Sequence, residues 1–507
     1  METHFDFNDI YVLDLANNHQ GNVDHALNII RDHGAVLQKH GVRAGIKFQF
    51  RQMDTFIHPD HHANSDNKHI PRFLSTWLKP DQYKTLLDEV RKHNLMSICT
   101  PFDEESVDVI TDMGFDIIKV ASCSATDWPL LEKVSQAALP VIVSSGGLTV
   151  SQIDDVVSFF EHRGVDFALM HCVSIYPTPS DLCNLANIRM LRERYPNLVV
   201  GWSTHEDPDD TAPVMVAIGQ GAEMYERHVG LNTDKYTLNA YSSTPEQVDL
   251  WIAASRKAIA LNGIKERPAP QSVETESIDS LRRGVFAKTP IKKGTKLSRE
   301  LVYFAMPYTD GQLSSGHWNE AIVAQASFKA DIALLESALE IPKVTDAQVI
   351  KSAVHEVKAL LNVARVVLNS DFEVEYSHHF GVGKFLEIGA VIITCINRDY
   401  CKKILVQLPN QKHPEHYHKR KEETFQVLWG ELHSVIDGRH HVLYPGDTAL
   451  VLPGVWHHFW TETGCVFEEI SSTHYNNDSV YRDPNINKMT REERKTIVDH
   501  WGRYQLD

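Results

Sequence analysis

The sequence predicts an α/β fold that begins with a (β/α)8 TIM barrel and ends with a small domain of short β-strands. Eight short apolar runs recur along the first 265 residues, and amphipathic helical patterns separate them. Strands and helices that alternate in this way are typical of a parallel sheet closed into a barrel. No Gly-x-Gly-x-x-Gly follows the first run, which disfavours an open doubly wound sheet only modestly.

The apolar runs predict the barrel strands in chain order. They cover 10–15, 44–50, 95–100, 116–121, 140–145, 167–173, 198–202 and 222–225. Helical patterns such as 23–39 and 151–162 lie between them. Polar residues stand at the carboxyl ends of nearly all the runs, and in a barrel these ends meet at the face where barrel enzymes carry their chemistry.

Length and charge limit the classes of protein and partner. A chain of 507 residues is too long for one core, so several domains are expected. The net charge of -17 argues against nucleic acid and anionic membrane surfaces as partners. Seven cysteines without paired spacing indicate a reducing compartment. The acidic start is no signal peptide and no run of about 18 apolar residues occurs, so a cytoplasmic location is expected.

Two histidines follow successive predicted strands. His205 ends the seventh strand and His228 the eighth, and Glu226 precedes His228 by two residues. Two imidazoles and a carboxylate suit a divalent metal that faces an oxygen-rich substrate. Satisfied hydrogen-bonding histidines are the alternative.

Two lysines lie inside apolar strands. Lys47 and Lys119 are flanked by Ile46, Phe48, Ile118 and Val120. A lysine in such a place is costly unless it meets an anion. With the serines after the fifth strand, these lysines predict a phosphate or carboxylate pocket, and structural ion pairing is the alternative.

Motifs in the barrel resemble the sialic acid synthase family, in family order and over almost all of residues 8–262. They are Asn18-His19-Gln20-Gly21, Ile46-Lys47-Phe48-Gln49, Thr100-Pro101-Phe102, Ile118-Lys119-Val120-Ala121-Ser122, Ser144-Ser145-Gly146, His171-Cys172, Ile175-Tyr176-Pro177-Thr178-Pro179 and Glu226-Arg227-His228.

The resemblance implies condensation of phosphoenolpyruvate with an aldose to give a 2-keto-3-deoxy sugar acid and phosphate. It assigns phosphoenolpyruvate to Lys47, Lys119, Ser122 and Ser144, and Mn2+ or Mg2+ to His205 and His228. Further catalytic or substrate-binding residues on these strand ends are Asp14, Gln49, Thr100, Ser174, Tyr176, Ser203 and Glu226.

Three departures from the family pattern concern the sugar. Asp14 stands where the family usually has Glu, and Ser124 stands where it usually has Glu after the fourth strand. The run 234–242 differs from the usual Gly-Pro-Asp-His type. Because the phosphoenolpyruvate residues persist, these changes indicate a different aldose and not lost activity.

A polar, proline-rich linker over 265–272 predicts a domain boundary. Residues 276–340 resemble the antifreeze-like (SAF) domain that follows the barrel in this family. The resemblance implies a homodimer in which this domain covers the partner's barrel. Met306-Pro307 stands at the family's arginine-proline pair, whose arginine meets the sugar's N-acetyl group. A substrate without that group is therefore expected, unless the loop is misaligned.

A helical connector is predicted over 341–370 and a metal-binding β-domain over 371–507. His416 and His418 lie two residues apart and face the same side of a strand, and Glu423 follows after a short turn. With His457 as fourth ligand, or adjacent His458, this order resembles the cupin metal site. The expected ion is Mn2+, Zn2+, Fe2+ or Ni2+. The charged tail over 490–501 predicts a helix.

Further residues of this domain resemble cupin sugar isomerases of the D-lyxose isomerase type. Lys421 lies between the metal residues, and Glu469 follows the last ligand. The resemblance implies Glu469 as the base that moves the C1/C2 proton, and Lys421 as its partner. A structural metal, or sugar binding without turnover, is the alternative.

Together the domains predict a bifunctional enzyme in which the cupin interconverts an aldose and the barrel joins it to phosphoenolpyruvate. A mannose-like aldose without an N-acetyl group is favoured. One rival is an N-acetylhexosamine-specific synthase with a sensory cupin. Another is a non-catalytic sugar-binding protein, although Lys47, Lys119, His205 and His228 argue against degeneracy.

Overall fold

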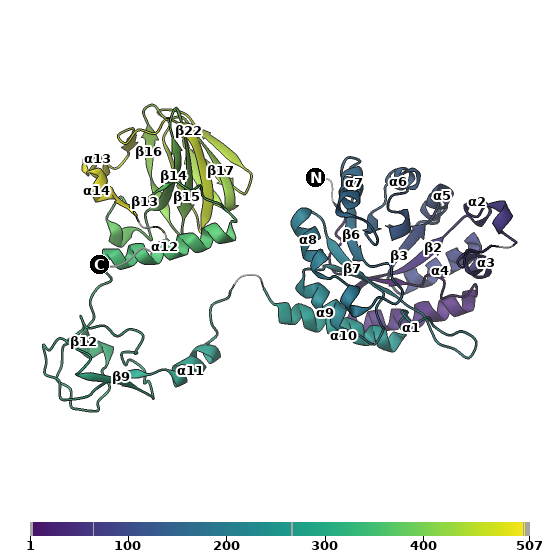
Figure 1. The fold of residues 1–507 in the computed structure, drawn as a ribbon, viewed down its shortest axis with the longest axis horizontal. Helices are drawn as coiled ribbons and strands as arrows, with labels where there is room; N and C mark the ends of the chain where they lie inside the picture. Colours follow the sequence, from purple (N-terminus) through teal and green to yellow (C-terminus); the bar gives the residue numbers. More distant parts are fainter. Residues whose placement is uncertain (1–3, 64, 265–266, 500, 502–507) are drawn as a thin grey trace. The chain divides into compact units, whose positions relative to one another are not determined.

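The structure is a computed structural model, and it describes residues 4–63, 65–264, 267–499 and 501. The chain divides into two compact units, Met1–Pro268 and Ala269–Asp507 (Figure 1). Among the described residues, no helix combines the length and apolarity that crossing a membrane requires. The finer domain limits predicted above remain predictions.

The first unit is a closed barrel of eight parallel strands in the order β1 to β8, which confirms the predicted fold class. The strands are β1 (Ile10–Asp14), β2 (Arg43–Phe50), β3 (Met96–Pro101), β4 (Ile117–Val120), β5 (Val141–Ser144), β6 (Phe167–Cys172), β7 (Val200–Thr204) and β8 (Met224–His228). β7 and β8 continue two and three residues beyond the predicted ends at 202 and 225, because their polar residues stay buried and paired with neighbouring strands.

Helices surround the barrel (Figure 1). They are α1 (Val23–His40), α4 (Pro80–Lys92), α5 (Glu104–Met113), α6 (Trp128–Ser135), α7 (Val150–Glu161), α8 (Ala186–Arg194), α9 (Ala212–Gly219) and α10 (Pro245–Asn262). Two short helices, α2 (Met53–Phe56) and α3 (Ile70–Thr76), interrupt the connection from β2 to α4. Side-chain caps begin several helices; the Thr244 side chain, for example, accepts from the Gln247 backbone N–H at the start of α10.

The barrel interior is layered along the strand direction. Side chains alternate between the interior and the helices, so Ile10, Val12 and Asp14 of β1 point inward. Ile10 and Val12 belong to an apolar cluster with residues of the other strands, such as Ile117 of β4. Asp14 and Lys119, the next inward residues of β1 and β4, are polar. The apolar layer therefore supports a polar layer at the carboxyl ends of the strands.

The second unit starts with α11 (Ser272–Leu281) and a small β-rich segment. Its strands pair as β9 (Gly284–Ala287) with β10 (Val302–Ala305), and β11 (Val323–Ala324) with β12 (Leu339–Glu340). Val285, Leu313 and Leu334 belong to its own apolar cluster. This segment coincides in position with the predicted antifreeze-like domain.

α12 (Asp346–Val363) begins at the Thr345 cap and provides the predicted connector helix. Its apolar face, with Ile350, Val354 and Val357, packs against Val374 and Tyr376 of the following β-domain. The connector is therefore part of that domain's core.

The β-domain consists of two antiparallel sheets, with strand orders β20-β17-β22-β15-β14-β13-β24 and β19-β18-β21-β16-β23. The first holds β13 (Glu373–Ser377), β14 (Ala390–Asn397), β15 (Tyr400–Gln407), β17 (Glu423–Gly430), β20 (Thr448–Val451), β22 (Cys465–Ser472) and β24 (Lys495–Ile497). The second holds β16 (Lys412–His418), β18 (Leu432–Ile436), β19 (Arg439–Leu443), β21 (His457–Trp460) and β23 (Ser479–Tyr481).

The tail differs from the helix predicted over 490–501. Only one turn, α14 (Arg491–Arg494), is helical, and β24 then pairs with β13 at the sheet edge. Glu and Arg favour helices, which explains the prediction. Strand pairing wins because Lys495 forms an ion pair with the largely buried Glu375, and the hydroxyl of Thr496 is hydrogen-bonded to His378.

Candidate active site and metal centre

The polar layer of the barrel centres on Lys47. Its Nζ lies 2.9 Å from Asp14 Oδ2 and 2.8 Å from Glu226 Oε1, and all three side chains are buried. Burial opposes the lysine charge, but the two carboxylates outweigh burial and raise the pKa of Lys47 above its usual value. Burial likewise opposes ionisation of Glu226, yet Lys119 and Lys47 lower its pKa. Lys47 and Glu226 are therefore both charged at neutral pH.

Lys119 is less completely paired than Lys47. Its Nζ donates to Ser144 Oγ at 2.5 Å and lies 3.5 Å from Glu226 Oε2. Burial is the largest influence and lowers the pKa of Lys119, although Glu226 partly offsets it. Lys47 therefore forms the structural ion pairs that were the alternative to an anion pocket. Lys119 has fewer partners and could still bind a further anion.

The two barrel histidines lie side by side at the same edge. Their ring centroids are 5.1 Å apart, and Asp14 Oδ2 is 3.5 Å from His228 Nε2. His205 Nδ1 lies 3.1 Å from the backbone oxygen of Val173, which leaves its Nε2 for a ligand. Burial lowers the pKa of His228, which keeps it neutral, and its buried Nδ1 has no hydrogen-bond partner. Two adjacent imidazoles beside a carboxylate fit a divalent ion.

Serine hydroxyls gather around Gly146. The Gly146 N–H donates to Ser122 Oγ at 3.1 Å. A Cβ on Gly146 would lie 2.6 Å from Ser122 Oγ and 2.4 Å from Ser174 Oγ, so any larger residue would displace both hydroxyls. The loop after β5 therefore brings two hydroxyls and a backbone amide together.

The remaining predicted residues lie at the strand ends. Ser203 Oγ donates to Glu226 at 3.3 Å, and Thr100 is buried with an unpartnered hydroxyl. Gln49 accepts a hydrogen bond from Arg51. Tyr176 is 49 % exposed, and its ring centroid lies 4.3 Å from that of His205. Tyr176 therefore forms the exposed edge of the group.

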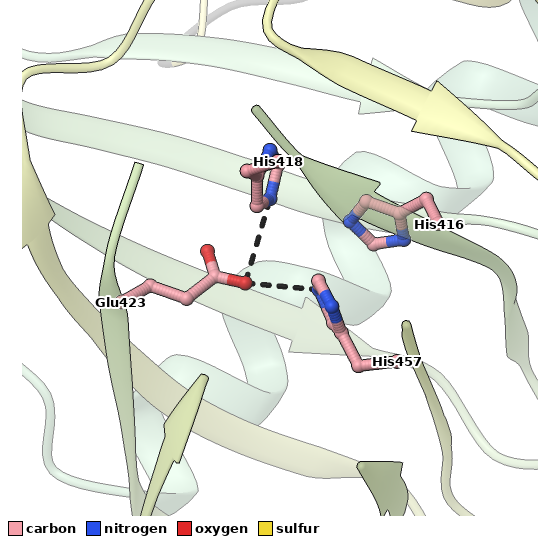
Figure 2. Close-up of side chains that lie close together, drawn as sticks. All are labelled: His416, His418, Glu423 and His457. Atoms are coloured by element: carbon pink, nitrogen blue, oxygen red, sulfur yellow. Dashed lines mark ion pairs between the residues drawn. The ribbon is translucent and has the colours of Figure 1, made fainter. Parts of the chain in front are cut away.

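The cupin-like domain holds a second group, formed by His416, His418, Glu423 and His457 (Figure 2). All four are buried, and one ligand atom from each lies within 4.8 Å of the others. Glu423 Oε1 is 2.9 Å from His457 Nε2 and 3.4 Å from His418 Nε2. Among the described residues, only this set brings three or more ligand side chains so close.

The strands and the backbone orient these histidines. His416 on β16 is opposite His457 on β21, and Glu423 begins β17. The Nδ1 atoms of His416 and His457 lie 3.0 and 3.1 Å from the backbone oxygens of Pro414 and Val455. Such contacts fix the tautomer that leaves Nε2 for a metal. The group could therefore hold a metal ion.

Neighbouring histidines on β21 face opposite sides. His457 is buried in the group, whereas the His458 ring stacks near Trp460 at 5.6 Å. The strand alternation therefore selects His457 over His458.

Lys421 joins this group to Glu469. The Lys421 ammonium forms ion pairs with Glu423 and, at 2.8 Å, with Glu469. Glu469 also accepts from Lys403 Nζ at 3.0 Å and from Ser471. Burial would raise the pKa of Glu469, but Lys403 and Lys421 outweigh it and lower the pKa to about 2. Glu469 is therefore ionised at neutral pH.

Comparisons with known proteins agree with the assignments of the barrel and of the C-terminal β-domain. Residues 37–267 match the NeuB family, and residues 404–467 match the cupin domain. An uncharacterized protein of Methanocaldococcus jannaschii is 32% identical over 292 residues, which are 57% of this chain and 82% of that protein. The chain belongs to the NeuB family. The resemblance to sialic acid synthases is thereby confirmed.

Other relatives of this NeuB-family chain are named for polysaccharide and sialic acid synthesis. The crystal structure assigned to spore coat polysaccharide biosynthesis protein E of Chromobacterium violaceum is 45% identical, with a TM-score of 0.62, over 66% of this chain and 99% of that one. The N-acetylneuraminate-9-phosphate synthase of Drosophila melanogaster is 31% identical over 231 residues, which are 44% of this chain and 60% of that protein.

Two residues of this NeuB-family chain escaped the sequence analysis. Lys403 contacts Glu469 from β15, and Arg51 contacts Gln49 at the rim of the barrel. Both show the pattern that identified Lys47. Lys403 lies inside β15, directly before apolar residues, and Arg51 follows Lys47 and Gln49 at alternate positions.

Proposed function

We propose that the barrel condenses phosphoenolpyruvate with an aldose and consumes one water, giving a 2-keto-3-deoxy sugar acid of the nonulosonic or ulosonic type and phosphate. The observation that carries this proposal is the single polar layer in which Lys47 and Lys119 meet His205 and His228. Lysines suit the phosphate and the histidines suit a metal beside the aldehyde. Membership of the NeuB family supports the same reaction class.

The residues of the polar layer have two different proposed roles, metal binding and neutralisation of the phosphate. His205 and His228 would hold a divalent ion such as Mn2+ or Mg2+, which would supply Lewis acidity toward the aldehyde oxygen. Lys119 and Lys47 neutralise the phosphate as it leaves, with Ser144 donating a hydrogen bond.

Asp14 and Glu226 hold Lys47 in place, and Asp14 also contacts His228. Ser122 and Ser174 add hydroxyls beside Gly146. Gln49, Thr100, Ser203 and Tyr176 line the strand ends where the substrates would lie.

The acceptor in this proposal is mannose-like and lacks an N-acetyl group. Asp14 is one methylene shorter than Glu, and Ser124 replaces a carboxylate. Met306 replaces the arginine expected to meet the acetyl group. The proposal includes a homodimer in which the segment 276–340 covers the partner's barrel.

The cupin would interconvert the aldose by isomerisation or epimerisation. Glu469 is the proposed base and Lys421 its partner, beside Mn2+, Zn2+, Fe2+ or Ni2+ at His416, His418, Glu423 and His457. The ion pairs of Lys421 support this role. Lys421 contacts both Glu423 of the metal group and Glu469, so it connects the proposed base to the metal group.

Phosphate release from phosphoenolpyruvate with Mn2+ tests the proposal. D-Mannose, N-acetylmannosamine and D-fructose are offered separately, and product mass is measured. Release with mannose and with fructose supports both activities, because a ketose serves the barrel only after isomerisation. Release with N-acetylmannosamine alone contradicts the non-acetylated acceptor and favours the rival synthase with a non-catalytic cupin.

The variant His205→Ala separates the synthase from a non-catalytic sugar-binding protein. It should abolish condensation, while sugar binding by the cupin, measured by calorimetry, stays unchanged. A wild-type protein that binds sugars and releases no phosphate with any aldose would favour the binding protein.

A further inference from the structure

Arg51 continues a row of inward-facing residues at the rim of the barrel. Lys47, Gln49 and Arg51 occupy alternate positions along β2 and its end, so their side chains follow one another toward the mouth. Lys47 lies in the ion-pair layer, and Arg51 Nη2 donates to Gln49 Oε1 at 3.1 Å. Arg51 thus sits four residues above Lys47, about 13 Å along an extended strand.

Two aromatic rings hold the Arg51 guanidinium. Its central carbon lies 4.0 Å from the Phe73 ring centroid and 3.7 Å from that of Phe102. Phe73 comes from α3 and Phe102 from the end of β3, so the guanidinium is fixed by two separate elements. Stacking of this kind occupies the faces of the guanidinium and leaves its edge for hydrogen bonds.

No carboxylate of the described residues forms an ion pair with Arg51, and Asp14 acts on its charge only from a distance. Within the described part of the chain, no Asp or Glu oxygen lies within 4.0 Å of it, and its buried Nε has no hydrogen-bond partner. Arg51 is only 9% exposed. Burial lowers its pKa to about 10, so it remains charged at neutral pH. A buried, charged guanidinium without an ion-pair partner is costly unless an anion completes it.

We propose that Arg51 is a specificity-determining residue that binds an oxyanion, a carboxylate or a phosphate, carried by the acceptor aldose. Planar bidentate recognition of such groups is the interaction for which arginine is suited. The inference rests on the proposed condensation and names the class of its acceptor.

The acceptor is a better occupant than phosphoenolpyruvate. Lys47 and Lys119 already serve the phosphate of phosphoenolpyruvate in the polar layer, and Arg51 lies well above that layer. Arg72 on α3 adds a second positive charge at the same rim, where its Nη2 donates to the Asn17 backbone oxygen at 3.3 Å. The end of the acceptor that is far from its aldehyde would therefore meet a positive rim.

Steady-state kinetics with three probes test the inference. D-Mannose 6-phosphate, D-mannuronate and D-mannose are compared at saturating phosphoenolpyruvate with Mn2+. The wild type should show a kcat/KM at least about 10-fold higher for a charged probe than for D-mannose, from a charge-assisted hydrogen bond. The better of the two charged probes identifies phosphate or carboxylate as the group.

The variant Arg51→Gln should remove this preference. It should lower kcat/KM for the charged probe about 10- to 100-fold and leave D-mannose and the KM for phosphoenolpyruvate unchanged. Arg51→Lys should retain part of the preference, because charge remains without the planar fork. Arg163→Gln is the matched control, since Arg163 stacks on Phe159 at 3.7 Å beside a cavity at the opposite end of the barrel.

Three results would overturn the inference. One is a wild type that prefers D-mannose. Another is an Arg51→Gln variant that changes only the KM for phosphoenolpyruvate. The third is a variant that changes only the melting temperature, as a purely structural stack would.

If phosphoenolpyruvate releases no phosphate with any of the three sugars, the result contradicts the proposed condensation and leaves the role of Arg51 to a binding experiment. Calorimetric titration of D-mannose 6-phosphate and D-mannose into wild type and Arg51→Gln, each with phosphoenolpyruvate, then decides the role of Arg51. Tighter binding of the charged sugar that the variant loses supports the inference, and equal binding overturns it.

Discussion

Lys421 and Glu469 form a buried ion pair, with Lys421 Nζ 2.8 Å from Glu469 Oε1, and the same ammonium also pairs with the candidate metal ligand Glu423. One cation therefore stabilises two buried carboxylates. Removing a partner from such a network costs far more than a surface pair, because the carboxylates stay buried.

The variant Lys421→Met should lower the free energy of unfolding of the cupin by about 3 kcal/mol without metal. Added Mn2+ should reduce this loss, because the ion takes over neutralisation of Glu423. Calorimetric melting with Mn2+ or with EDTA measures both effects. Lys402→Met is the matched control: Lys402 pairs with Glu468 near the surface, so less than about 1 kcal/mol is expected. Equal losses in the two variants would contradict the shared-cation role.

Adjacent histidines on β21 allow a test of the metal ligands. His457→Ala should remove the cupin metal, while His458→Ala should retain it, because only His457 faces Glu423. Metal content after dialysis is measured by mass spectrometry in a His205→Ala, His228→Ala background, which eliminates any barrel metal. Loss of metal in the His458 variant alone would reverse the assignment.

The barrel and the metal group were predictable because their patterns are local. Apolar runs with a polar residue at the end indicate a strand that leads to a site, and His416 and His418 share a face by the two-residue period of a strand. The tail was not predictable, since the pairing of Lys495 with Glu375 joins residues 120 apart in sequence. Helix propensity there indicates the wrong structure.

The role of Lys403 also depends on distant contacts. It contacts Glu469, 66 residues away, only because β15 and β22 pair. The sequence shows a lysine in a strand but not its partner. The burial of Arg51 between Phe73 and Phe102 is likewise visible only in the structure.

Gly146 should be essential for the serine pocket. Gly146→Ala places a Cβ 2.4 Å from Ser174 Oγ and 2.6 Å from Ser122 Oγ, so both hydroxyls must move. The KM for phosphoenolpyruvate should rise at least about 10-fold, from the loss of one charge-assisted hydrogen bond. Gly147→Ala is the control: its φ of +77° strains the backbone by about 1 kcal/mol, but no atom lies within 4 Å of its Cβ. Stability should fall there with little change in KM; the reverse pattern would contradict this view of the loop.

His19 should contribute to acid sensitivity of the barrel. Burial first, and then the charge of Arg72, lower the pKa of His19 to about 4, and its Nδ1 accepts from the Gly21 N–H at 3.1 Å. The unfolded chain binds this proton near pH 6.5, whereas the folded barrel binds it only near pH 4. Stability is therefore complete above about pH 6.5 and falls as the pH decreases toward 4, by about 2 kcal/mol at pH 5 from this group.

His19→Asn retains an acceptor for Gly21 and cannot titrate in this range. Between pH 7 and pH 5 the variant should lose about 2 kcal/mol less stability than the wild type, measured by urea unfolding of the barrel. His58→Asn provides the background, because His58 lies exposed on the surface. If the stability of wild type and of His19→Asn falls in parallel as the pH decreases, His19 is not kept neutral by its surroundings. If the two stability profiles run together above pH 7 and separate below it, the depressed pKa of His19 explains the difference.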